Sequence, residues 1–248
     1  MDRRPRPPGT LFAIFTAVTI SVNSAPAAIV TTNEAGMDGV FSQASFGTDP
    51  IDIQFLPTMV HVDPNLLSIQ DDSALQQLFG LGGTAPTAFI FYVDTIDYCG
   101  GFNTSIVGCG QVGGNKFAVE SSFAAGHFGT ELNSHELVHN LGLGHAGSPN
   151  PDAPSTDNLM GPSLNGNTTL TSAQVGNGND SIDQNNFLAG IQNPLVQGDA
   201  GSQFISIQPI LITAAPAAVP EPSSLAVLGL GTVAFLGYRR RRARQLAA

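Results

Sequence analysis

The chain has no tryptophan, and among its 248 residues it has only two cysteines, five histidines and nine Lys or Arg. Three of these cations lie within residues 1–10 and five within residues 239–244, so Lys116 is the single one between them. Acidic residues are more numerous, with nineteen Asp and Glu. A central region so poor in cations argues against nucleic acid binding. Its negative charge favours solubility after export, with a preference for cationic substrates as the alternative.

The first 27 residues have the pattern of a secretory signal peptide. Arginines precede the apolar run LFAIFTAVTISV, which is followed by small residues that include Ala25 and Ala27. This order of a basic, an apolar and a small-residue part is typical of a segment that is removed on export. The alternative is an uncleaved membrane anchor, for which the run is short.

The other end of the chain combines three parts in a fixed order. Pro220, Glu221 and Pro222 precede an apolar stretch at 225–238, and arginines follow it. Residues 219–248 therefore resemble the PEP-CTERM sorting tail of Gram-negative bacteria. The resemblance implies an exosortase-type membrane enzyme as partner and cleavage near the tripeptide. It further implies an exported protein that is held transiently in the inner membrane by its tail and is then extracellular or matrix-associated. An ordinary tail anchor would share the topology.

The two cysteines, Cys99 and Cys109, are close in sequence. In an oxidising compartment such a pair predicts a local disulfide. A metal-binding role is the alternative, but the pair lacks close metal-ligand spacing and has no further cysteine to help it.

Local patterns predict a mixed set of helices and strands. Alternating or β-branched runs indicate strands at residues 50–57, 87–96, 115–123 and 203–213, and a capped apolar period indicates a helix at 73–80. The second of these strands is expected to be central, and the third is expected to be an edge strand. After residue 147, Asn, Gly, Ser, Asp and Pro dominate and predict irregular structure.

The stretch HELVHNLGLGH contains three of the five histidines. A helix that begins near Thr130 would place His135 and His139 one turn apart on one face, where both can bind one metal ion. Gly142 is suited to end that helix in a left-handed conformation, so that the chain turns back and His145 supplies a third ligand. Three protein ligands with an open position describe a catalytic zinc site. The remaining histidines, His61 and His127, stand alone and are interpreted as ordinary surface or core residues.

This stretch fills the HExxHxxGxxH pattern and resembles the metzincin clan of zinc metalloproteases. Met160 follows His145 in a turn-rich setting that resembles the clan's Met-turn, although a methionine there could also be simple core packing. The resemblance implies an α+β fold with a twisted mixed sheet and an active-site helix above an irregular lower subdomain. Some members add a tyrosine ligand after the Met-turn, where this chain has Pro162. We expect the metzincin-like domain over residues 28–195, followed by a late strand and linker over 196–218.

The resemblance also implies an activity. The chain is expected to be an exported zinc endopeptidase, in which a zinc-activated water attacks the peptide bond of a protein or peptide substrate and Glu136 acts as general base. A strand near 116–122 would hold the extended substrate by strand addition. The alternative is a surface or matrix adhesion protein with a catalytically weak zinc site, but the intact Glu136 favours the enzyme. The acidic and amide side chains of residues 177–186 are compatible with calcium, or with plain turns.

Overall fold

The structure is a computed structural model that describes residues 30–145, 158–175 and 193–214. The predicted signal peptide, the sorting tail and the 177–186 segment considered for calcium lie outside these residues. Among the described residues, no helix is long and apolar enough to cross a membrane.

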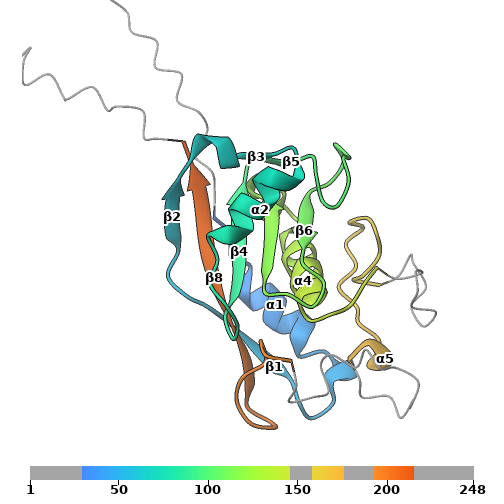
Figure 1. The fold of residues 1–248 in the computed structure, drawn as a ribbon. Coiled ribbons are helices and arrows are strands. Elements are labelled where there is room, and N and C mark those ends of the chain that lie inside the picture. Colours follow the sequence, from blue (N-terminus) through green and yellow to red (C-terminus); the bar gives the residue numbers. More distant parts are fainter. Residues whose placement is uncertain (1–29, 146–157, 176–192, 215–248) are drawn as a thin grey trace, which may run out of the picture.

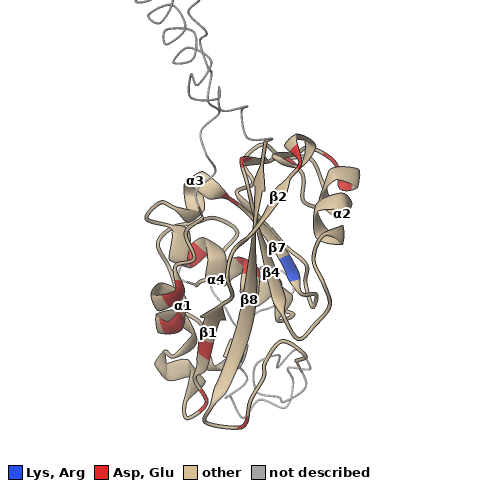
Figure 2. Cartoon of the chain, turned by 90° about the vertical axis from the view of Figure 1, so that its left-hand side faces the viewer, with Lys and Arg blue, Asp and Glu red and all other residues tan. Residues whose placement is uncertain are grey.

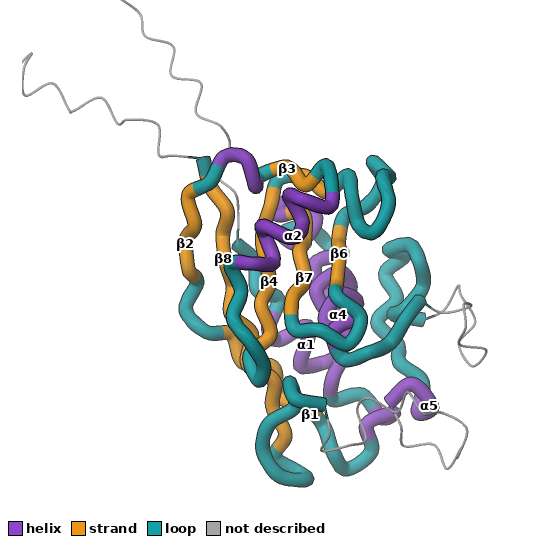
Figure 3. Tube along the Cα trace, in the orientation of Figure 1, coloured by secondary structure: helices purple, strands orange, loops and turns teal. Residues whose placement is uncertain are grey.

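The centre of the fold is a six-stranded mixed sheet (Figures 1 and 3). Its strands are parallel to their neighbours, except that β6 runs antiparallel to β7. In spatial order they are β1 (Ile51–Phe55), β8 (Gln203–Thr213), β4 (Ala88–Val93), β7 (Lys116–Glu120) and β6 (Gly108–Gly110), with β2 (Met59–Val62) pairing β8 beyond the end of β1. This mixed α/β arrangement agrees with the predicted α+β class at the level of its sheet.

Helices cover both faces of the sheet. Figure 2 shows α1 (Glu34–Phe41) and α4 (Gly129–Asn140) on one side of the strands and α2 (Asp72–Gly80) on the other. Two apolar cores follow from this layering, one beneath α1 and α4 and one beneath α2. The remaining short elements are η1 (Ala44–Phe46), η2 (Pro64–Leu66), β3 (Ser68–Ile69), β5 (Thr95–Ile96), α3 (Ser121–Ala124) and α5 (Ser172–Val175).

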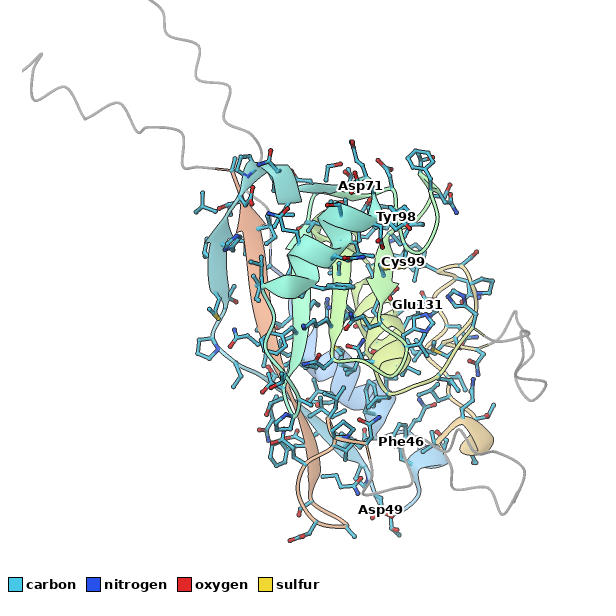
Figure 4. All side chains as sticks on the ribbon, viewed as in Figure 1. Phe46, Asp49, Asp71, Tyr98, Cys99 and Glu131 are labelled. Carbon is cyan, nitrogen blue, oxygen red and sulfur yellow. A yellow bond between two sulfur atoms is a disulfide. The ribbon has the colours of Figure 1, made fainter. Side chains whose placement is uncertain are left out.

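Most of the predicted elements are present. The run at 50–57 forms β1, whose residues Ile51 and Ile53 are buried on one face. The run at 87–96 forms the central strand β4 and the short β5. The helix predicted at 73–80 is α2, and Asp71 caps it by accepting a 2.8 Å hydrogen bond from the Ala74 N–H (Figure 4).

The late strand β8 is central to the sheet rather than an appendage. It pairs with β1 and β2 along one side and with β4 along the other, so the sheet extends across the boundary expected after residue 195. Pro209 is compatible with this position. The Ile207 carbonyl accepts a 2.8 Å hydrogen bond from the Leu56 N–H, so the backbone groups of Ile207 face the side of β1. Backbone groups two residues apart in a strand face the same side, so the proline nitrogen of Pro209, which carries no hydrogen, also faces that side. There the partner changes from β1 to β2, and no ladder bond is lost.

The prediction that residues 115–123 form an edge strand is wrong. β7 has neighbours on both sides, because Gly108–Gly110 folds back beside it as β6. β6 is therefore the edge strand. Its sequence Gly-Cys-Gly has low strand propensity, which explains why the pattern gave no sign of it.

Candidate metal centre

The first two histidines of the motif lie on α4, which begins at Gly129, one residue before the predicted start near Thr130. His135 and His139 face the same side of this helix, and their ring centroids are 4.6 Å apart. The helix ends at Asn140, and Gly142 then has a φ of 108°, a backbone conformation that favours glycine. The chain turns back at this point and brings His145 to the other two histidines, as expected.

The three histidines converge through their Nε2 atoms. His145 Nε2 lies 3.2 Å from His135 Nε2 and 3.3 Å from His139 Nε2. One ligand atom from each residue lies within 4.8 Å of the others, so the three side chains could hold one metal ion. The predicted ligand set is therefore brought together by the fold.

Backbone carbonyls fix which ring nitrogen carries the proton. His135 Nδ1 lies 2.7 Å from the Leu159 oxygen, and His139 Nδ1 lies 2.7 Å from the Leu143 oxygen. A carbonyl oxygen can only accept, so each Nδ1 must be the protonated donor. Burial lowers the pKa of His135 to about 3 and that of His139 to about 4, which keeps both rings neutral at pH 7. Both therefore present an unprotonated Nε2 toward His145.

This donor set fits a cation. A proton on His145 Nε2 could serve only one of the two facing lone pairs, and the other would stay buried without a partner. A metal ion accepts all three lone pairs at once. The pKa of His145 is also lowered by burial, which favours its neutral, metal-binding form.

Glu136 lies beside the histidines on α4. Its side chain is buried, and its Oε2 atom has no hydrogen-bond partner within the described part of the chain. Burial raises the pKa of Glu136 to about 8, against the smaller opposing effect of the Gly110 backbone N–H. A carboxyl group left without a cation partner in such surroundings is unusual for a merely structural residue.

The edge strand β6 packs directly onto this carboxyl group. A Cβ atom on Gly108 would overlap Glu136 Oε1, and one on Gly110 would lie 2.9 Å from Glu136 Oε2. Only glycine allows the strand to approach the helix this closely. The two glycines are thus site residues that the sequence reading missed, and a strand so short gave little signal for them.

A cavity of about 1020 Å³ opens over the site. The three histidines and Glu136 line it together with residues 103–110 of the disulfide loop and β6 and residues 161–164. The predicted disulfide between Cys99 and Cys109 is present, with an S–S distance of 2.04 Å, and it ties the loop to β6. The cysteine pair therefore has no thiolate to offer a metal ion, which excludes the alternative role.

Met160 lies in the segment that supports the histidines. Its side chain is fully buried in the core shared with α4, and its neighbour Leu159 provides the carbonyl bound by His135. Pro162 lines the cavity and offers no ligand atom. The isolated histidines are elsewhere: His61 lies on β2, and His127 is exposed and contacts the Phe128 ring in a tilted arrangement.

Glu131 is a further residue that the sequence reading missed. It is one turn before His135 on α4 and only 3% exposed (Figure 4). Its two carboxylate oxygens accept hydrogen bonds from the backbone N–H groups of Asn165 at 2.9 Å and Gly166 at 2.8 Å. The i, i+4 spacing from His135 is the signal that could have found it.

Residues 218–242 match the PEP-CTERM protein-sorting motif. This confirms the tail predicted from its three-part pattern. The motif implies export, sorting to the cell envelope through the C-terminal tail and an exosortase-type processing partner. No curated protein matches the chain.

The buried histidines make the metal-free protein sensitive to acid. Because the folded pKa values of His135 and His139 lie below the unfolded value of about 6.5, the unfolded chain binds more protons between these limits. The contribution of these two histidines to the free energy of unfolding is thus complete above about pH 6.5 and falls as the pH drops toward 4. At about pH 5 the loss is roughly 2 kcal/mol for each histidine. Urea unfolding of chelator-treated protein at several pH values measures it. A pH dependence unchanged by H135N and H139N would contradict this origin.

Proposed function

We propose that the protein is an exported zinc endopeptidase of metzincin type that hydrolyses peptide bonds in protein or peptide substrates. The observation that carries the proposal is the convergence of three imidazole Nε2 atoms beside a buried carboxyl group, one of whose oxygens has no hydrogen-bond partner in the described part of the chain, in one open cavity. The HExxHxxGxxH pattern and the position of Met160 support the same clan.

Zinc is the metal that this site suits best. Neutral imidazoles are among the preferred ligands of zinc, and three protein ligands with a free position toward solvent are typical of its catalytic sites. His135, His139 and His145 would hold the ion, and the cavity leaves room for a water and a substrate carbonyl. The carbonyls of Leu159 and Leu143 orient two of the rings, a common support for metal-binding histidines.

Glu136 is the proposed general base. A bound zinc ion supplies a Lewis acid for the scissile carbonyl and lowers the pKa of a water toward ~7. The positive charge favours the ionised form of Glu136, although burial alone would keep it protonated. The carboxylate can then take the proton of the attacking water and deliver it to the departing amine. Gly110 packs directly against this carboxylate, which limits its movement during both transfers.

The free edge of β6 is the proposed substrate-binding strand. Within the described residues, β6 pairs with β7 alone, and residues 108–110 line the cavity. An extended peptide that adds to this edge would pass alongside Glu136 and the histidines. We therefore propose that β6, rather than residues 116–122, binds the extended substrate.

A digestion experiment tests the proposal against the adhesion alternative. Purified exported protein is incubated with casein and with a broad peptide library in three states: as isolated, after metal removal with a chelator, and after addition of zinc. We expect cleavage that is lost with the metal and restored by zinc. If the zinc-loaded protein binds one equivalent of metal but cleaves none of the substrates, the adhesion role is favoured.

Processing of the sorting tail gives a separate prediction. In a host that carries an exosortase, mass spectrometry of the exported protein should find a C-terminus close to Pro220–Pro222, without the arginines at 239–244. Changing Pro220, Glu221 and Pro222 to alanine should leave the protein in the inner membrane fraction, because the recognised tripeptide is lost. A mature chain that still ends at Ala248 would identify the segment as a simple anchor.

A further inference from the structure

The segment from Asn158 to Val175 contacts the metal site through the Leu159 carbonyl, although it has almost no regular structure. Figure 3 draws it as loop except for α5. Side chains hold it in place at three positions. Gln43 binds the Thr168 carbonyl and the Leu170 N–H, Glu131 binds Asn165 and Gly166, and Asn158 binds Gln174. The last of these contacts is adjacent to the residue that orients His135.

Asn158 and Gln174 form a reciprocal pair of amides in the interior. Each is 1% exposed. The Asn158 Nδ2 donates to Gln174 Oε1 at 2.6 Å, and the Gln174 Nε2 donates to Asn158 Oδ1 at 2.9 Å. Asn158 Oδ1 also accepts from the Met160 N–H at 2.8 Å. A buried polar pair with both amides satisfied in this way is rigid.

The geometry of one peptide group connects this pair to the metal site. The Leu159 carbonyl and the Met160 N–H belong to the same planar trans peptide, so they point in opposite directions. The N–H is bonded to Asn158 Oδ1 and the carbonyl to His135 Nδ1. When the amide pair holds the N–H, the carbonyl on the other side is aimed at the histidine.

We infer that the Asn158–Gln174 pair is a positioning device for His135. It fixes the Leu159–Met160 peptide plane and thereby sets the protonated nitrogen and the ring orientation of that ligand. The inference rests on the metal site proposed above. His139 does not depend on the pair, because its carbonyl partner is Leu143, in the turn that follows its own helix.

A matched pair of substitutions tests this inference. Gln174→Met and Gln43→Met each remove one amide that holds the same segment, with little change in volume. Only Gln174 is connected to the Leu159–Met160 peptide. We expect Q174M to weaken zinc binding about 10–100-fold, the usual effect of losing a residue that orients a ligand. Q43M should bind zinc nearly as the parent protein does. Competition with a chromophoric chelator measures both affinities.

The histidine Nδ1 protons provide a readout that general loosening would not reproduce. In the metal-free protein, NMR should show the His135 Nδ1–H signal shifted or lost in Q174M and the His139 Nδ1–H signal unchanged. The double variant N158A/Q174M should bind zinc no more weakly than the weaker binder of the single variants N158A and Q174M, because the two amides act as one unit. If Q174M does not fold, Gln174→Glu keeps the shape and an acceptor oxygen, and the same comparison can be made with it.

The outcomes separate the inference from the proposed function. Equal losses of zinc affinity in Q174M and Q43M, or equal changes at both histidine protons, would overturn the positioning role while leaving the metal site intact. If the parent protein itself fails to bind zinc, the proposed function fails and the inference fails with it.

Discussion

Exchange of Glu136 for glutamine should reduce peptide hydrolysis by at least ~10²-fold and leave the zinc content at one ion per chain. Glutamine has nearly the same shape, so the packing against β6 survives. It cannot accept the proton of the attacking water, whereas the three histidines that would hold the metal are unchanged. Turnover of a cleaved peptide and metal analysis of the same sample measure the two quantities.

Glu120 supplies a matched control for this experiment. Glu120 also lines the cavity and is half-buried, but its carboxyl group accepts a hydrogen bond from the Ile96 N–H. Glu120→Gln keeps that acceptor oxygen and should leave turnover close to that of the parent protein. Near-normal turnover in E136Q would rule out the assigned general base.

Replacing Gly108 with alanine should produce the second large effect. The new methyl group would overlap Glu136 Oε1 and lie 2.7 Å from Leu132 Cδ1, so β6 or the carboxyl group must move. A displacement of about 1 Å in a catalytic group can cost on the order of 10²-fold in turnover. Crowding of this kind also costs about 1–3 kcal/mol in the free energy of unfolding. Peptide turnover and urea unfolding measure these losses.

Gly101 is the control for Gly108. It lies in the same disulfide loop, and a Cβ atom there would meet nothing within 4 Å. Gly101→Ala should therefore leave both turnover and stability nearly unchanged. The atoms nearest to the Cβ of G108A belong to Glu136 and Leu132 rather than to a histidine, so G108A should still bind zinc. If G108A lost its metal and its activity together, the effect would lie in the ligands rather than in Glu136.

The sequence was sufficient to predict the parts of the site that are close together in the chain. His135, His139 and His145 lie within one helix and the turn after it, so their spacing alone specified the convergence of the three rings. The disulfide between Cys99 and Cys109 was predictable for the same reason. Strong local patterns also predicted β1, β4 and α2.

Features that depend on contacts between distant segments were not predictable. β6 is a strand only because β7 pairs with it. Its two glycines are required only because Glu136, which is distant in the sequence, packs against them. Nor does any local pattern place Asn158 beside Gln174, since polar residues in an irregular segment usually indicate a surface loop. The edge position given to residues 115–123 was wrong for this reason: local alternation does not reveal which strand lies next to it.

The central position of β8 determines when the sheet can form during export. β1 and β2 have no strand partner in the described sheet other than β8, which is the last of its strands in the sequence. A chain that crosses the membrane from its N-terminus would deliver the histidine helix well before residues 203–213. Until those residues emerge, the sheet beneath the helix lacks its middle, and the cavity has no rigid support. For the endopeptidase proposed above, hydrolytic activity would then begin only after residues 203–213 have crossed the membrane and paired with β1, β2 and β4.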